Sequence, residues 1–309
     1  MKLRLGFLAF VLAALLGFSP GGGGDPQQFV LYDLFAGQNA GTTVSPGVGS
    51  AAVPIGARTS RSTALVNGQV TLIVGIIGDS ISANSGPSAY TTTQSNNDNL
   101  SIYDGNMYAY SDPVIGASNG PGSMWGILAD RLIANTAGRG TPYTRVITID
   151  PAIGGTTSGD WSITGNFQNR MRVACLRARS LGYPISGSGN GGNWKFVWLY
   201  RLGTNDNAVS TSPSVYTSNA KSTFATLQSY GCTSKIIVSE MTLLAGVVSS
   251  GLQTAQAGLV DSVTIFTGDN ADSLTGIGTN RAPDGTHFNL TGETADAALI
   301  DTALSNAGF

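Results

Sequence analysis

Residues 71–84 read TLIVGIIGDSISAN, and this stretch decides the fold that the sequence predicts. The run up to Gly78 is apolar without the alternation expected of a strand that has one face in water. Such a run is typical of a strand buried on both faces, as in a parallel sheet. Gly78 lets the chain turn tightly as it leaves the strand, so Ser80 is presented at the strand's carboxyl end. Open α/β sheets place their chemistry at that edge.

Strands and helices alternate along the rest of the chain. Further strands are predicted over residues 145–149, 195–199, 235–239 and, more briefly, 263–266. Helices are predicted over residues 123–135, 167–181, 216–230, 252–260 and 291–306. Residues 82–122 are rich in Asn, Ser, Tyr and Gly and are predicted to form a long polar loop. This alternation favours an α/β fold with a mostly parallel sheet covered by helices on both faces.

The composition narrows the classes of function. The 309 residues carry 16 basic and 18 acidic side chains, which gives no electrostatic footprint for nucleic acid or an anionic membrane. The chain has one histidine and two cysteines, too few for any familiar metal site built from these residues. We therefore expect no metal and no cofactor, although an all-oxygen metal site stays open. Cys175 and Cys232 could form a disulfide or remain two separate buried thiols.

The start of the chain is typical of an exported protein. Lys2 and Arg4 precede an apolar run over residues 5–18, which predicts a signal peptide over residues 1–20 and a secreted or periplasmic protein. A buried N-terminal helix is one alternative, and a retained anchor is another because no clear A-x-A cleavage site is present. The run is shorter than the roughly 20 residues that span a membrane, so no stable span is expected after signal removal. Residues 21–66 are predicted to form a Gly-rich linker and a small extension, and residues 67–309 the main domain.

Three later segments complete a set with Ser80. The sequence DPAIGGTTSGDW (150–161) follows the second predicted strand, and RLGTNDN (201–207) follows the third. The sequence PDGTHFNL (283–290) contains the only histidine. Because carboxyl ends of parallel strands share one edge of a sheet, Ser80 and the segments after the second and third strands are expected to lie together.

These residue types fit nucleophilic catalysis. A serine hydroxyl needs a base within hydrogen-bond reach, and His287 is the only imidazole in the chain. Asp284 can reach the other ring nitrogen across a turn and fix its tautomer. The oxyanion of a tetrahedral intermediate needs donors, which the N–H groups of Ser80 and Gly155 and the Asn205 amide could supply. In isolation, Asn205 could equally belong to an Asx-turn and Gly155 to a plain turn.

The four blocks resemble those of the SGNH, or GDSL-type, hydrolases over residues 70–306. The motifs are GDS, IGGT, GTND and DGTH, in that order along the chain. The resemblance implies a three-layer αβα sandwich of the flavodoxin-like hydrolase type. It also implies a carboxylic ester hydrolase that works through an acyl-enzyme without a cofactor. The residues it carries over are the nucleophile Ser80, the triad partners Asp284 and His287, and the oxyanion donors Ser80, Gly155 and Asn205.

A narrower resemblance concerns the substrate. The segment SDPVIGASNGPGSMWGILADRL (111–132), followed by AIGGT and Trp161, is similar to the sialate O-acetylesterase-like branch of carbohydrate esterases. It implies an acetyl ester of a carbohydrate, with Trp161 as a candidate sugar-stacking residue or else a hydrophobic plug. The nucleophile block departs from that branch, with GDSI where the branch favours GQSN.

Other functions stay open at this point. A lipase or thioesterase of the GDSL type is the closest alternative, although the long polar loop offers no apolar lid. A non-catalytic surface or phage-associated module on the same fold is the other. The expected partner is a small-molecule or polysaccharide acyl ester, and the sequence gives no indication of the oligomeric state.

Overall fold

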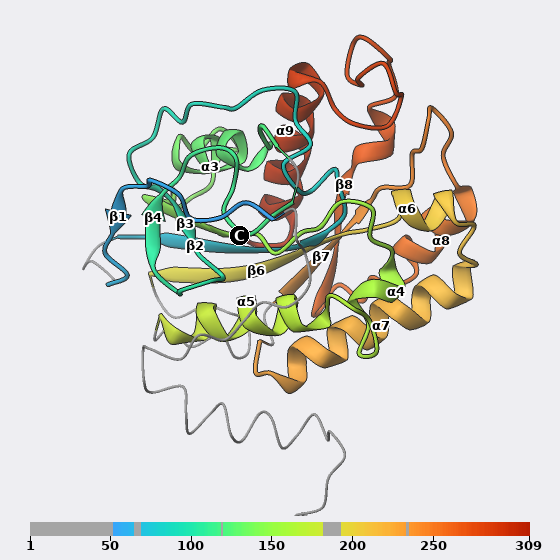
Figure 1. Ribbon diagram of the computed structural model, residues 1–309, viewed down its shortest axis with the longest axis horizontal. Helices are drawn as coiled ribbons and strands as arrows, with labels where there is room; N and C mark the ends of the chain where they lie inside the picture. The colour runs from blue at the N-terminus through green and yellow to red at the C-terminus, as the bar shows by residue number, and fades with distance from the viewer. Residues whose placement is uncertain (1–51, 65–68, 119, 182–192, 233–234) are drawn as a thin grey trace, which may run out of the picture. The chain divides into compact units, whose positions relative to one another are not determined.

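The apolar run forms β2 (Thr71–Gly78), an inner strand whose eight residues are all buried. The computed structural model describes residues 52–64, 69–118, 120–181, 193–232 and 235–309, all within one unit, Thr43–Phe309. The predicted signal peptide and most of the predicted extension lie outside these residues. The described strands form an eight-stranded sheet in the order β1-β4-β3-β5-β2-β6-β7-β8 (Figure 1).

The sheet is mostly parallel, as predicted. β2 is parallel to β5 (Arg145–Ile149) on one side and to β6 (Trp194–Arg201) on the other. β7 (Lys235–Glu240) and β8 (Ile265–Asn270) continue the parallel order beyond β6. In the register of the sheet, Thr71 lies opposite both Arg145 and Trp194, so the three inner strands run in step toward one carboxyl edge.

Helices cover both faces of the sheet, which confirms the three-layer α/β fold. α3 (Trp125–Ile133) and α9 (Leu290–Asn306) pack together on one face (Figure 1). α5 (Gln168–Ser180), α7 (Pro213–Ser229) and α8 (Ser250–Ala257) lie on the other. Three short helices, α4 (Ser158–Trp161), α6 (Thr204–Ala208) and the 3-10 helix η1 (Ala271–Ser273), follow β5, β6 and β8. None of the described helices is both long enough and apolar enough to span a bilayer.

The predicted loop over residues 82–122 contains two strands, so that part of the prediction is wrong. β3 (Asn97–Leu100) pairs with β5, and β4 (Met107–Ala109) pairs antiparallel with β3. β3 reads NDNL, which has no apolar pattern, yet all four residues are buried. Asn99 is satisfied there because its amide donates to the Thr148 carbonyl over 2.8 Å while its Oδ1 accepts from the backbone of Ile115.

The described part of the predicted extension adds the edge of this sheet. β1 (Ser60–Arg61) pairs antiparallel with β4, and the backbone N–H of Val53 donates to the Ala117 carbonyl over 2.9 Å. Residues 60–61 therefore belong to the same sheet that carries β2, and Val53 is hydrogen-bonded to the loop before α3.

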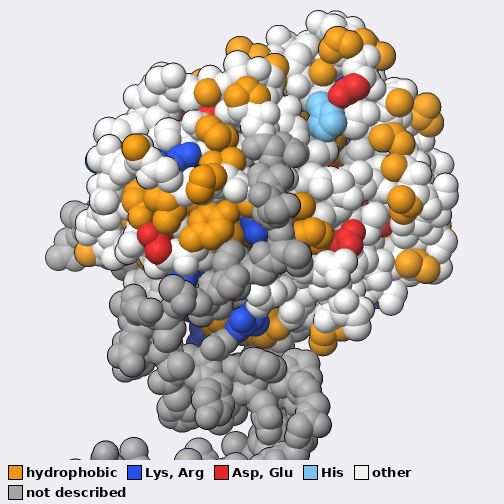
Figure 2. All heavy atoms as spheres, viewed as in Figure 1, with side chains coloured by type: hydrophobic (Ala, Val, Ile, Leu, Met, Phe, Trp, Pro, Cys, Tyr) orange, Lys and Arg blue, Asp and Glu red, His pale blue; other side chains and the backbone are white. Residues whose placement is uncertain are grey.

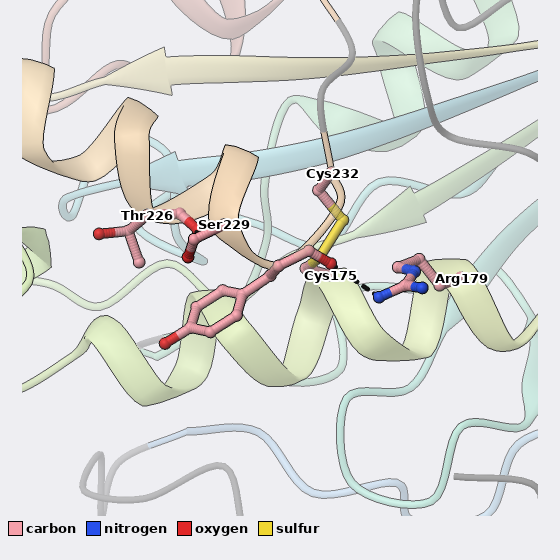
Figure 3. Close-up of a disulfide and its surroundings, with 6 residues drawn as sticks. Cys175, Arg179, Thr226, Ser229 and Cys232 are labelled. Carbon is pink, nitrogen blue, oxygen red and sulfur yellow. Dashed lines mark hydrogen bonds between the residues drawn. A yellow bond between two sulfur atoms is a disulfide. The ribbon is translucent and has the colours of Figure 1, made fainter. Parts of the chain in front are cut away.

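A disulfide joins Cys175 on α5 to Cys232, which follows α7 (Figure 3). Arg179, one turn after Cys175, donates to the Tyr230 carbonyl over 2.8 Å (Figure 3). Of the two possibilities that the sequence left open for these cysteines, the structure has the bridge. It connects the two long helices on one face of the sheet.

Candidate active site

Ser80 is held in a rigid turn at the carboxyl end of β2. A Cβ on Gly78 would lie only 2.3 Å from the Ser82 Cβ, so only glycine fits where the strand ends. Asp79 is fully buried, and its Oδ1 accepts the backbone N–H of Ile81 over 3.1 Å. Burial raises the pKa of Asp79 to about 7, more than the hydrogen bond from Ile81 lowers it. Asp79 therefore stabilises the turn from its buried side, while Ser80 is partly exposed.

The structure brings Ser80, His287 and Asp284 into one hydrogen-bonded chain. His287 Nε2 lies 2.9 Å from Ser80 Oγ, and His287 Nδ1 lies 2.7 Å from Asp284 Oδ2. Partial burial acts to raise the pKa of Asp284, but hydrogen bonds from the His287 ring and from the backbone of Thr286 and His287 bring it below its usual value. The histidine, the only one in the chain, is visible at the surface in Figure 2.

Three N–H donors at the same edge are without acceptors among the described residues. They are the backbone N–H groups of Ser80 and Gly155 and the side-chain amide of Asn205. The Asn205 Nδ2 is buried, so it is not satisfied by bulk water. Gly155 has φ of +80°, a left-handed conformation that glycine adopts without strain. These donors come from the segments after β2, β5 and β6, as the parallel order predicted.

Two hydrogen-bonded links that the sequence did not reveal position these segments. The Ser118 Oγ accepts the backbone N–H of Gly154 over 2.6 Å, which fixes the glycine block from the loop before α3. Asp206, buried at the start of α6, accepts two hydrogen bonds from Ser158 at the start of α4. Burial raises the pKa of Asp206, against hydrogen bonds from Ser158 that lower it. A serine and an aspartate 48 residues apart carry no sequence signal for such a pair.

Trp161 does not lie where a sugar could stack on it, so that prediction is wrong. Its side chain is fully buried, its Nε1 donates to Thr156 Oγ1 over 3.0 Å, and its ring centroid lies 5.9 Å from that of Phe167. The hydrophobic plug, which was the alternative, fits this placement. The position of Trp161 in the sequence, within the segment after the second predicted strand, gives no indication of whether its ring faces the site or the core.

The loop after β7 borders the histidine turn. The backbone N–H of Gly246 donates to the Gly285 carbonyl over 3.0 Å, and that of Ala245 donates to Thr286 Oγ1 over 2.8 Å. The next two residues of this loop, Val247 and Val248, are 65% and 41% exposed. The loop therefore presents apolar side chains to solvent beside the turn that carries His287.

The arrangement as a whole can perform acyl transfer. A hydroxyl is hydrogen-bonded to an imidazole whose other nitrogen is oriented by a carboxylate. Unpaired donors stand at the same sheet edge, where a developing negative charge on oxygen would be stabilised. Among the described residues, no cluster of three or more His, Cys, Asp or Glu side chains is arranged to hold a metal ion.

Comparison of the sequence finds no matching family model and no matching curated protein. Comparison of the structure finds a protein from Arabidopsis thaliana at 16% identity and a TM-score of 0.54, covering 76% of this chain and 96% of that one. This match shows a shared fold. Two other similar structures are a lipase/acylhydrolase from Enterococcus faecalis and a psychrotrophic esterase from Pseudoalteromonas sp. Their identities are 15% and 13%, their TM-scores 0.45 and 0.42, and they cover 76% of this chain and 95% and 97% of their own.

Proposed function

We propose that this protein is a serine carboxylic-ester hydrolase of the SGNH type, with Ser80, His287 and Asp284 as its catalytic triad. One observation carries the proposal. Ser80 Oγ is 2.9 Å from the only imidazole in the chain, and that imidazole is 2.7 Å from Asp284. Ser80 and His287 are 207 residues apart, and packing of the fold does not require them to meet at a partly exposed sheet edge. Nucleophilic catalysis does require this contact.

The reaction follows from the groups in place. His287 accepts the Ser80 proton as Oγ attacks the ester carbonyl, and the leaving alcohol takes that proton from the imidazolium. Asp284 holds the imidazole in the required tautomer and stabilises its charged form. The N–H groups of Ser80 and Gly155 and the Asn205 amide stabilise the oxyanion. Water then attacks the acyl-enzyme by the same route in reverse, which releases the acid and restores Ser80.

For the substrate, we propose a short acyl group, most simply acetyl, on a carbohydrate. The support is the resemblance of residues 111–132 to carbohydrate esterases and the build of that region. Asp112 accepts hydrogen bonds from the Tyr110 hydroxyl and from the backbone of Tyr90 and Ser123. These bonds hold the polar segment before α3 in one conformation. Export of the protein is part of this proposal, and a disulfide is consistent with an oxidising compartment.

A longer acyl chain is the second candidate, because of one observation. Val247 and Val248 are exposed beside the histidine turn, and Val209, just after α6, is 64% exposed. Apolar side chains on two loops of the same edge would suit a lipase or thioesterase. Rates on p-nitrophenyl acetate and p-nitrophenyl octanoate separate the two: a higher kcat/KM on acetate supports the short-chain assignment, and the reverse supports the lipase.

The triad itself is tested with a fluorophosphonate probe, which phosphonylates only an activated serine. We expect labelling at Ser80 in the wild type and none in Ser80→Ala or His287→Ala. Ser88→Ala, which changes an exposed serine in the same region, is the matched control and should label fully. A wild-type protein that neither labels nor hydrolyses p-nitrophenyl acetate would instead favour the non-catalytic module.

A further inference from the structure

The histidine turn is anchored from behind by one buried arginine. Arg281 lies six residues before His287 and is fully buried. Its Nη1 donates over 2.6 Å to the carbonyl of Thr286, the residue directly before His287. Its Nε donates over 2.6 Å to the carbonyl of Leu274, and its Nη2 donates to the carbonyl of Ala271. One guanidinium therefore contacts the histidine turn and the segment after β8 at the same time.

The kind of acceptor distinguishes Arg281 from Arg201, a second buried arginine near the sheet edge. Arg201 forms ion pairs with Asp269 over 2.6 Å and Asp296 over 2.5 Å, so its charge is neutralised locally. The hydrogen bonds of Arg281 go to three backbone carbonyls, and its Cζ lies 3.8 Å from the centroid of the Phe288 ring. Burial lowers the pKa of Arg281 to about 10, despite the opposing effect of nearby carboxylates. Burying a cation costs free energy, so we ask which parts of the chain its hydrogen bonds keep in place.

The hydrogen bonds of Arg281 fix the position of the turn that carries His287 relative to Ser80. The segment after β8 continues directly from the last strand of the sheet, and the same sheet leads to Ser80 at the end of β2. The histidine turn is also linked to the loop after β7 by the Gly246–Gly285 and Ala245–Thr286 hydrogen bonds, which come from an exposed loop, and Phe288, directly after His287, is buried in the core. Arg281 adds a buried, hydrogen-bonded connection from the histidine turn to the segment after β8. The planar guanidinium suits this role because its N–H groups diverge at fixed angles toward separate acceptors.

We propose that Arg281 is a positioning residue, which holds His287 within hydrogen-bond distance of Ser80. The inference rests on the proposed function, since it concerns the same site. Without the guanidinium, the Thr286 carbonyl loses its donor and the imidazole is free to shift from Ser80 Oγ. A displacement of about 1 Å at a reacting group can reduce a rate by about 10²-fold, while substrate binding elsewhere in the site is unaffected.

The test compares Arg281→Met and Arg281→Lys with Arg139→Met. Arg139 is the control because it is also buried and donates to backbone carbonyls, those of Asp301 and Phe309, near the far end of α9; it also forms an ion pair with the Asp301 carboxylate over 2.6 Å. We expect Arg281→Met to lower kcat by about 10²-fold with little change in KM. Arg281→Lys, whose compact ammonium cannot reach three widely separated carbonyls at once, should lower kcat about tenfold. Arg139→Met should lose stability but keep kcat.

The sole histidine provides a second readout that does not depend on turnover. Its imidazole NMR signals in Arg281→Met should move toward those of Ser80→Ala, because both changes remove the contact between the ring and Ser80. Wild-type kcat together with unmoved imidazole signals in either folded Arg281 variant would overturn the proposal. If the wild type itself does not label at Ser80, the proposed function fails, and the NMR comparison still decides whether Arg281 positions the ring.

Discussion

The carboxylate of Asp206 accepts both the backbone N–H of Ser158, over 2.8 Å, and its hydroxyl, over 2.7 Å. Ser158 belongs to the segment that follows Gly155, and Asp206 directly follows Asn205. This pair therefore joins the two loops that supply the proposed oxyanion donors. Asn219 on α7 donates to Ser158 Oγ over 3.1 Å and ties the pair to the helical layer. The relative placement of Gly155 and Asn205 depends on this contact.

Asp206→Asn should reduce kcat by about 10- to 10²-fold, because an amide cannot accept both hydrogen bonds from Ser158 and one charge-assisted bond is lost. KM should change little. Steady-state kinetics on p-nitrophenyl acetate measure both. A smaller loss is expected for Ser158→Ala, which keeps the backbone N–H. Equal kcat in Asp206→Asn and the wild type would show that the loops are held without this pair.

Asn205→Ala should reduce kcat by about 10²–10³ with KM nearly unchanged, as for the removal of one preorganised donor. Asn106→Ala, the same truncation on an exposed turn between β3 and β4, is the control and should retain full activity. An Asn205→Ala variant that keeps its kcat would place the oxyanion donors elsewhere.

Glu293→Gln should stabilise the protein at alkaline pH. Burial raises the pKa of Glu293 to about 8, so the native state favours the protonated form more than the unfolded state does. The stability that this group contributes is present at pH values below the ordinary glutamate pKa and is lost as pH rises through about 8. Urea unfolding should thus show the variant more stable than the wild type at pH 9, with the difference shrinking toward pH 4. A difference independent of pH would contradict the assignment.

Replacing Cys175 and Cys232 together by serine should destabilise the fold by about 4 kcal/mol, since the bridge closes a loop with a sequence separation of 57 residues. Cys232 lies between the end of α7 and the amino end of β7, and Cys175 on α5 is bonded to it there, away from the carboxyl edge that carries Ser80. The free energy of unfolding should fall, therefore, while kcat of the folded variant stays at the wild-type value. A parallel loss of kcat would show that the bridge acts on the site.

Sequence alone predicted the part of this fold that depends on apolar patterning. The unbroken run in β2 and the parallel order around it were predictable because buried strands need apolar residues on both faces. β3 was missed because its stability depends on buried carboxamides such as Asn99, which find backbone partners only in three dimensions. Local spacing could pair Asp284 with His287, but not Ser158 with Asp206. The orientation of Trp161 depends on packing against Phe167 and was equally out of reach.

The separation of Ser80 and His287 along the sequence has a consequence for synthesis of the chain. The nucleophile is translated at position 80, but its base is translated 207 residues later, after every strand of the sheet. On the proposed chemistry, a chain that has been translated only as far as β8 carries Ser80 but not yet the imidazole that activates it. Hydrolysis then begins only after all the described strands have been translated, and turnover can serve as a reporter of their assembly.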